Sequence, residues 1–314
     1  MLSAPSTGSP AVIARWFFTP APPSRLGRMR VLVGGYTLYY LGKRWRLITK
    51  TAGGKRRDFR PIGVIRPLRQ PLPLTAVKAL TIANYAATAA FMAGWRHRVT
   101  GPAHAGLTLS TITYRNSWSM IFHTDNLVAL HGLILAVAPS ADATSLDARR
   151  RPTSPAASWR YGWPLQLVNT ITVATYVLAG VAKLSGPLGW RWAHGSSLRN
   201  QVAVDGIRKY ALDGTRPGQN RAVDLLERWP CAWQLLAVGS LALELGAPIA
   251  LVDRRVGRLW AVAAWSMHGG IKSIMKINFR YQLSGIPYAP FFNVERLVCR
   301  PARGSIEPPG FRGV

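Results

Sequence analysis

Charged side chains inside apolar stretches are the residues of this sequence best placed to do chemistry. Lys183 ends the apolar stretch 176–184, and Glu244 lies deep within another. Such groups are costly in a membrane helix unless they are paired or face a cavity. Lys183 is therefore either an anchor at a helix end or a partly buried amine able to act as a base. Glu244 either forms a structural ion pair, with Lys183 or Lys272, or takes part in catalysis.

A second group of polar residues surrounds the start of an apolar stretch. His123, Asp125 and Asn126 precede this stretch, and His131 lies within it. Taken singly, Asp125 is expected to cap a helix and His131 to be a hydrogen-bonded core residue. Together the four residues would place several hydrogen-bond donors and acceptors beside one membrane helix.

A third group has helical spacing. His268, Lys272 and Lys276 follow one another at intervals of four, which places them on one helix face. This face could contact an anionic intermediate or a lipid phosphate, or it could simply mark a helix end. No metal site is predicted, because the sequence has no H-E-x-x-H pattern and Cys231 and Cys299 form no motif.

The elements that position these residues are apolar stretches separated by Arg-rich connectors. The longest, 229–252, carries Glu244 as its only charge, and a long polar connector is predicted over 185–228. We predict an all-α polytopic membrane bundle of about seven transmembrane or membrane-embedded helices. It would fill residues 29–295, between a flexible, basic, Pro-rich tail (1–28) and a basic tail (296–314). Its predicted segments are 29–41, 74–95, 103–120, 126–137, 163–184, 229–252 and 259–277, followed by a broken or re-entrant piece at 283–292.

The formal net charge of +28 has two explanations. Nucleic acid phosphates bind clustered Lys and Arg, but the sequence lacks zinc-finger spacing, RNP-like aromatic motifs and a clear helix-turn-helix. Connectors that meet anionic headgroups explain the charge without such motifs. We therefore expect the lipid bilayer and anionic lipid headgroups as partners, with no nucleic acid. The N-terminus does not resemble a signal peptide, and the expected location is integral to a bacterial cell membrane.

Several short motifs occur in the order found in one family. The sequence over roughly residues 28 to 295 resembles the horizontally transferred transmembrane domain, the membrane part of vitamin K-dependent gamma-glutamyl carboxylases. The most specific motif is Ala-Gly-x-x-Lys-Leu, which ends at Leu184 and is followed by Gly-Trp-Arg-Trp. The matching segments are 123–126, 161–164, 176–184, 189–192, 195–198, 244–246, 268–281 and 290–292.

The resemblance implies a chemistry. In the carboxylases the lysine after the Ala-Gly pair is the base that deprotonates vitamin K hydroquinone, and Lys183 occupies that position. The resemblance thus implies a reduced, vitamin K-like quinone as cofactor and a carboxylase- or epoxidase-like activity. The supporting catalytic groups would be His123, His131, Glu244 and His268, and the binding groups Asp125, Asn126, Lys272 and Lys276.

The sequence departs from the family in two places. The Asn-His pair of the carboxylase quinone site is met only approximately, by Asp125 and Asn126 followed by Leu127. The chain also lacks a large portion beyond the membrane region, so we expect a lipid-soluble ligand rather than protein glutamate. The alternative is a non-catalytic membrane scaffold, transporter or lipid-binding protein. Convergence of Lys183, Glu244 and the histidines on one enclosed pocket would favour an enzyme.

Overall fold

The chain is all-helical in the computed structural model, which describes residues 14–118, 121, 123–150, 153–213, 220–229 and 231–296. Every regular element in these ranges is an α- or 3-10 helix, and a single isolated bridge pairs Ala21 with Ser158. The predicted all-α class is therefore confirmed.

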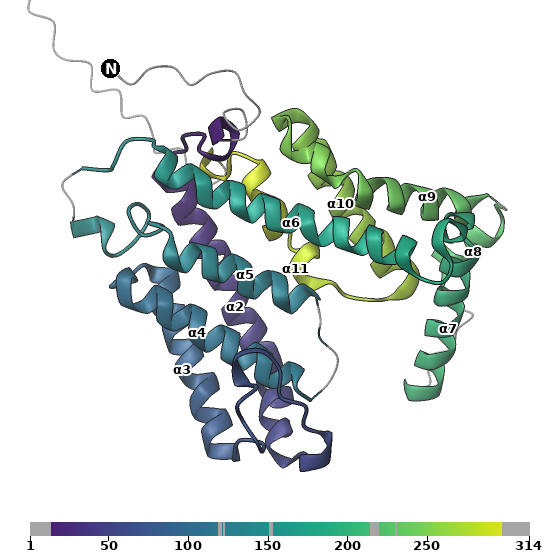
Figure 1. The fold of residues 1–314 in the computed structure, drawn as a ribbon, viewed down its shortest axis with the longest axis horizontal. Helices are drawn as coiled ribbons and strands as arrows, with labels where there is room; N and C mark the ends of the chain where they lie inside the picture. The colour runs from purple at the N-terminus through teal and green to yellow at the C-terminus, as the bar shows by residue number, and fades with distance from the viewer. Residues whose placement is uncertain are drawn as a thin grey trace, which may run out of the picture.

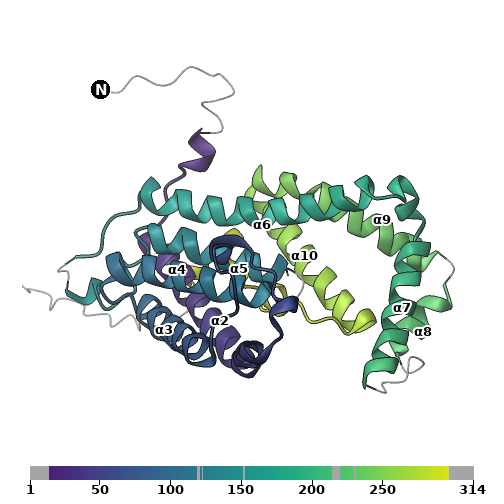
Figure 2. The same cartoon turned by 60° about the horizontal axis from the view of Figure 1, so that its bottom comes forward.

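The first half of the chain forms a group of four helices in which each packs against the next, and the first packs also against the last (Figures 1 and 2). Pro23 opens the first of them, where its missing N–H costs nothing. Gly94, with a φ of 66°, ends the second. The four helices are α2 (Pro23–Lys50), α3 (Leu74–Ala93), α4 (His97–Asn116) and α5 (His123–Val137).

Helix α6 (Trp159–Ser185) connects the two halves of the molecule (Figure 1). The Ser158 side chain accepts a hydrogen bond from the Arg160 amide and caps its first turn. The helix packs against α2 and α5 on one side and against elements of the second half on the other. Residues along α6 can therefore contact helices of both halves.

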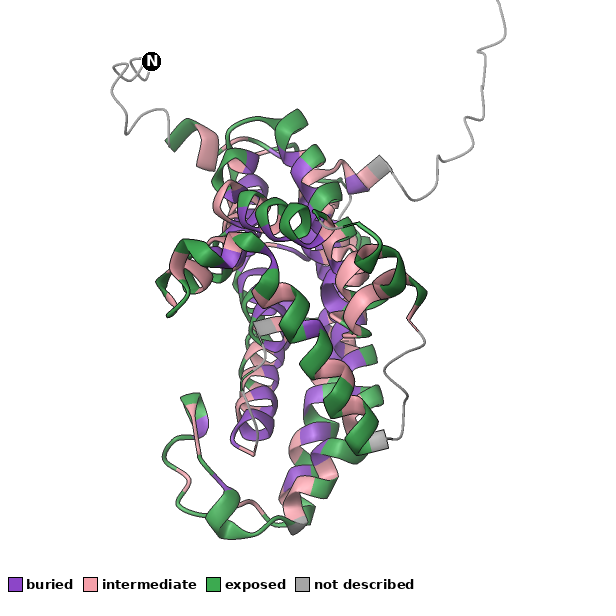
Figure 3. Cartoon of the chain, turned by 90° about the vertical axis from the view of Figure 1, so that its right-hand side faces the viewer, coloured by how far each residue is buried: buried purple, intermediate pink, exposed green. Residues whose placement is uncertain are grey.

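The second half surrounds the far end of α6. Pro248 interrupts the apolar stretch there, because it cannot donate to a continuing helix. The Asp253 carboxylate accepts from two amides and caps the next helix. The elements are α7 (Ser196–Asp213), α8 (Arg221–Glu227), α9 (Ala232–Leu245), η6 (Ala247–Leu251), α10 (Arg254–Met275), α11 (Arg280–Leu283) and η7 (Ile286–Phe291). In both halves the buried residues lie along the inward faces (Figure 3).

Three predicted boundaries were wrong. The end of the tail predicted to reach Arg28 is helical, because α2 begins at Pro23. The connector 185–228 contains α7 and α8. The stretch 229–252 is not one helix: α9 has 14 residues and ends at Leu245, before Gly246 and Pro248.

The predicted break after residue 283 is present, as α11 and the 3-10 helix η7. The predicted tail 296–314 lies almost wholly outside the described residues.

Helix α6 is the one element in the described part of the chain that is long and apolar enough to cross a membrane. Only 39% of its apolar window is buried within the chain. The apolar parts of α5 and α9 are shorter than a span. The structure thus supports the predicted bundle as a set of helices but not the count of about seven spans.

The loop after α5 is held against α2 and α3 by buried polar contacts. Arg30, which is fully buried, donates to the carbonyl oxygens of Ser140 and Thr144. The Asp147 carboxylate accepts from the amides of Arg96 and His97 at 2.9 Å each. Partial burial acts to raise the pKa of Asp147, but these hydrogen bonds outweigh it and hold the pKa below its ordinary value.

Asp147 predicts an acid-dependent loss of stability. Because its pKa is lowered by folding, its contribution is present above the unfolded pKa of about 4 and is lost as pH falls through the folded pKa. Asp147→Ala should therefore cost about 1 kcal/mol at pH 7 and nothing once the carboxylate is protonated. Thermal unfolding of both proteins from pH 7 to pH 3 tests this. A difference that stays constant with pH would contradict it.

Candidate functional site: a polar face along α6

One face of α6 carries a row of residues that contact, in order along the helix, α5, then α10 and η7, then α9. Thr172, Tyr176, Gly180 and Lys183 follow at intervals of four, four and three, which is the spacing of a single helix face. Thr172 contacts α5, Tyr176 contacts α10 and η7, and Gly180 and Lys183 meet α9. The polar groups singled out in the sequence are thus arranged along α6 rather than gathered at one point.

Lys183 and Glu244 form an ion pair between α6 and α9. The lysine Nζ donates to both carboxylate oxygens at 2.6 Å. The side chain of Glu244 is 6% exposed and that of Lys183 is 25% exposed. The lysine nitrogen also lies 4.6 Å from the centre of the Trp192 ring, a cation–π contact. The predicted pairing of these two residues is therefore present.

A glycine allows the two helices to approach closely enough for this pair. A Cβ built on Gly180 would lie 3.1 Å from the Cβ of Glu244 and 2.9 Å from a methyl group of Leu245. Small residues permit such close helix packing. The Ala-Gly-x-x-Lys motif thus has a local reason: the glycine admits α9, and the lysine one turn later reaches its carboxylate.

The ion pair lies in the wall of a half-open apolar cavity of about 420 Å³ lined by α6, η5 (Gly189–His194), α7, α9 and α10. Trp192, Trp233, Met267 and Phe279 are among the large side chains that line it. Ser240 and Gln201 add two polar side chains. A mostly apolar lining with a few polar groups is typical of sites for small apolar molecules.

His268 does not line this cavity but contacts a residue that does. Its ring contacts that of Phe279 with centroids 5.2 Å apart, and Phe279 itself lines the cavity. Its Nδ1 lies 3.2 Å from the hydroxyl of Tyr176 and 2.9 Å from the carbonyl oxygen of Ala264. The hydroxyls of Tyr176 and Tyr288 are hydrogen-bonded to each other. His268 thus belongs to a buried tyrosine–histidine cluster next to the cavity.

His131 occupies a separate buried position. Its Nδ1 lies 2.8 Å from the hydroxyl of Tyr281 and its Nε2 3.2 Å from that of Thr172. Both ring nitrogens are therefore engaged, as expected for a hydrogen-bonded core histidine. His131 does not line the cavity beside Lys183.

Asp125 forms a second buried ion pair, with Arg115 of α4. The side chains are 1% and 5% exposed, and the Tyr40 hydroxyl donates to the same carboxylate oxygen at 3.0 Å. Sequence reasoning missed Arg115, although an arginine within a predicted membrane segment is the same signal that drew attention to Lys183 and Glu244. The expected capping role of Asp125 is replaced by a tertiary ion pair.

The remaining candidate residues do not join these clusters. Asn126, Lys272 and Lys276 are exposed, and Lys276 ends α10 with a φ of 55°. The side chain of His123, which begins α5, lies outside the described residues. Within the described ranges no three His, Cys, Asp or Glu side chains gather as they would around a metal ion.

Gly195 fixes η5, and with it Trp192, against α9. It has a φ of 81°, and a Cβ there would lie 2.4–2.5 Å from backbone atoms of Trp233 and Gln234. Gly195→Ala should therefore lower the free energy of unfolding by about 2 kcal/mol. Gly239→Ala in α9 is the matched control, because a Cβ there meets nothing within 4 Å. Equal unfolding midpoints for the two variants in detergent would contradict the prediction.

The chain matches no protein-family model, no curated protein and no solved structure. Its function must therefore be inferred from the residues and their geometry.

Proposed function

We propose that the chain is a membrane protein of the horizontally transferred transmembrane type that binds a reduced quinone or a similar lipophilic molecule beside Lys183. The observation that carries the proposal is the Lys183–Glu244 pair in the wall of the apolar cavity. The resemblance of the motif around Lys183 to that of the carboxylases supports the same ligand class.

Exposed apolar side chains support placement in a membrane. Large apolar residues of α9, η6 and α10 face outward, and Leu259 is 73% exposed. Many exposed apolar side chains are unfavourable in water but suit lipid. Together with α6, these helices would form the embedded part of the bundle. The exposed residues are Leu235, Leu236, Val238, Ile249, Val252, Val256, Leu259, Val262 and Trp265.

The cavity fits the proposed ligand class. Its volume of about 420 Å³ lies within the range of small-molecule sites, roughly 300–1,000 Å³. Aromatic side chains of the lining can stack on a flat ring, and Lys183 and Ser240 can hydrogen-bond to ring oxygens. When bound, a reduced quinone would supply an acidic hydroxyl group and reducing electrons.

Proton transfer at this site must involve both charged residues. A base needs a free lone pair, whereas the Lys183 nitrogen donates to both oxygens of Glu244. A proton must first pass from Lys183 to Glu244, which leaves a neutral amine beside a neutral carboxylic acid. The amine can then accept a proton from a ligand hydroxyl, and Glu244 can return its own proton to solvent. The two residues would thus act as one unit.

A glycine substitution can fill the cavity without disturbing its walls. Gly270 lines the cavity, and a Cβ at this position meets nothing within 4 Å. Gly270→Leu should therefore occupy the space of a ligand. Gly269→Leu is the matched control, because its Cβ is equally unobstructed and it does not line the cavity.

Quenching of tryptophan fluorescence by menaquinone provides the readout, since Trp192 and Trp233 line the cavity. We expect saturable quenching in the wild type and in Gly269→Leu, and loss of the saturable component in Gly270→Leu. Saturable quenching of equal strength in both variants would rule out this cavity as the binding site.

A non-catalytic function is the second candidate, and one observation favours it. The histidines lie in separate clusters, and Lys183 is fully engaged by Glu244. The same cavity could then hold a lipid or quinone without chemistry. Saturable quinone binding by the wild type without hydroquinone-dependent product formation above background would favour this candidate.

A further inference from the structure

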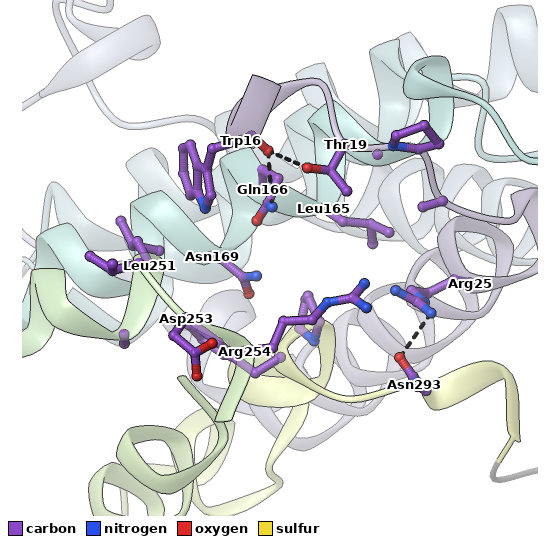
Figure 4. A pocket seen from close by; sticks show the side chains of 17 residues that line it. Trp16, Thr19, Arg25, Leu165, Gln166, Asn169, Leu251, Asp253, Arg254 and Asn293 are labelled. Carbon is purple, nitrogen blue, oxygen red and sulfur yellow. Dashed lines mark hydrogen bonds between the residues drawn. The ribbon is translucent and has the colours of Figure 1, made fainter. Parts of the chain in front are cut away.

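A second cavity, of about 350 Å³, lies near the opposite end of α6 (Figure 4). The N-terminal segment around Trp16, the first turns of α6, the junction of η6 and α10, and the chain after η7 form its walls. Asn169, which faces this cavity, precedes Lys183 by 14 positions, or ~21 Å along the helix axis. The two cavities are therefore separate sites.

Two arginines point toward each other across this second cavity (Figure 4). Arg25 donates through Nε and one terminal nitrogen to Glu295 and Asn293. The side chain of Arg254 lines the cavity and has no hydrogen-bond or ion-pair partner among the described residues. The Asp253 carboxylate is engaged by the amides of Arg255 and Val256. The Glu295 carboxylate already balances the charge of Arg25, so an anion in the cavity would be attracted mainly by Arg254.

A buried amide points into the same space. Asn169 is 6% exposed, and its Oδ1 has no hydrogen-bond partner in the described structure. A buried polar atom left without a partner costs about 1–3 kcal/mol. Gln166, one turn earlier on α6, lines the same wall and donates to the Trp16 carbonyl oxygen. The cavity therefore offers guanidinium groups for an anion and a buried acceptor for a hydroxyl group.

We propose that this cavity binds a phosphate ester that carries a free hydroxyl, with the phosphate between Arg254 and Arg25 and the hydroxyl donating to Asn169. Guanidinium groups bind phosphate oxygens through directional, charge-assisted hydrogen bonds. Trp16 beside the cavity is a residue typical of the membrane interface. The same chemistry occurs in the headgroup of phosphatidylglycerol and in soluble glycerol 3-phosphate.

Native mass spectrometry of the detergent-purified full chain with phosphatidylglycerol or phosphatidylcholine tests the site. Arg254→Met removes a charge-assisted hydrogen bond to the phosphate, and Asn169→Asp places a carboxylate in the cavity that repels the anionic headgroup, so each should weaken retention of phosphatidylglycerol about tenfold. Arg255→Met is the matched control, because Arg255 is exposed and does not line the cavity. Its retention should equal that of the wild type, and unchanged melting temperatures would verify that the variants fold.

A thermal-shift assay with added glycerol 3-phosphate distinguishes a soluble phosphate ester from a lipid headgroup as the ligand. Stabilisation of the wild type but not of Arg254→Met would show that a soluble phosphate ester suffices. Retention of phosphatidylglycerol without such stabilisation would identify a lipid as the ligand. Equal phosphatidylglycerol retention in the wild type, Arg254→Met and Asn169→Asp, with no response to glycerol 3-phosphate, would overturn the proposal.

Discussion

Arg115→Met should lower the free energy of unfolding by about 3–5 kcal/mol, the largest effect expected from any single substitution considered for this chain. Among the described residues, the substitution would leave the carboxylate of Asp125, which is 1% exposed, with the Tyr40 hydroxyl as its remaining hydrogen-bond donor. The Oδ1 atom of Asp125 already lacks a hydrogen-bond partner in the described structure. Denaturant titration in detergent micelles measures the loss.

Two further variants separate the buried charge from the lost side chain. Arg98→Met, on an exposed position of the same helix α4, should change stability by less than about 0.5 kcal/mol. The double variant Arg115→Met/Asp125→Leu should recover most of the loss, because it removes both charges. A double variant no more stable than Arg115→Met would show that the helices depend on packing of the arginine rather than on its charge.

Lys183→Met should lower the free energy of unfolding by about 2–3 kcal/mol, because it leaves the buried carboxylate of Glu244 without its ion-pair partner. The effect is smaller than that at Arg115, since the Lys183 side chain is 25% exposed and the Arg115 side chain only 5%. Unfolding of the purified protein in micelles measures it. Lys78→Met on an exposed position of α3 is the matched control and should leave stability unchanged.

Exchanging the two residues of the Lys183–Glu244 ion pair separates its contribution to stability from the role of the amine in a reaction. Lys183→Glu combined with Glu244→Lys keeps an ion pair between α6 and α9 but moves the amine to α9. Stability should recover relative to either single variant, whereas any reaction that needs the amine at position 183 should remain lost. Recovery of hydroquinone-dependent turnover together with stability would contradict the assigned role of Lys183.

The sequence was sufficient to predict the helical class and the most important pair. Apolar stretches located α3, α5, α6 and α10, because their composition and their Pro or Gly boundaries are local properties. The expectation that Glu244 must be compensated named Lys183 or Lys272 as its partner, since a lone charge in an apolar helix requires one, and the structure identifies Lys183.

Other features depend on distant contacts and could not be read from the sequence. Apolar composition alone suggested a single span over 229–252, whereas Gly246 and Pro248 end α9 early. The amphipathic helix α7 was missed because its polar residues resemble a connector. Which histidines share a site is likewise set by packing: His131 meets Tyr281, 150 positions away in the chain, and His268 meets Tyr176.

The contacts of Arg115 and Trp192 were not predicted from the sequence, for two different reasons. Arg115 carried a local signal, a charge within a predicted membrane segment, that was not followed. Trp192 was noted only as the end of the Gly-Trp-Arg-Trp sequence, because its position over the Lys183 amine depends on the turn at Gly195. Local chemistry thus identifies candidates, and tertiary packing determines which of them meet.

Photo-crosslinking tests most directly whether a lipophilic ligand occupies the space beside Lys183. A menaquinone analogue with a diazirine on its ring would be photolysed in membranes that contain the full chain, and labelled peptides would be mapped by mass spectrometry. Labels on the cavity residues Trp192, Met267 and Met275 that disappear with excess unlabelled menaquinone are the predicted result. Labels confined to outward-facing residues such as Leu259 and Val262, unaffected by competitor, would contradict the account.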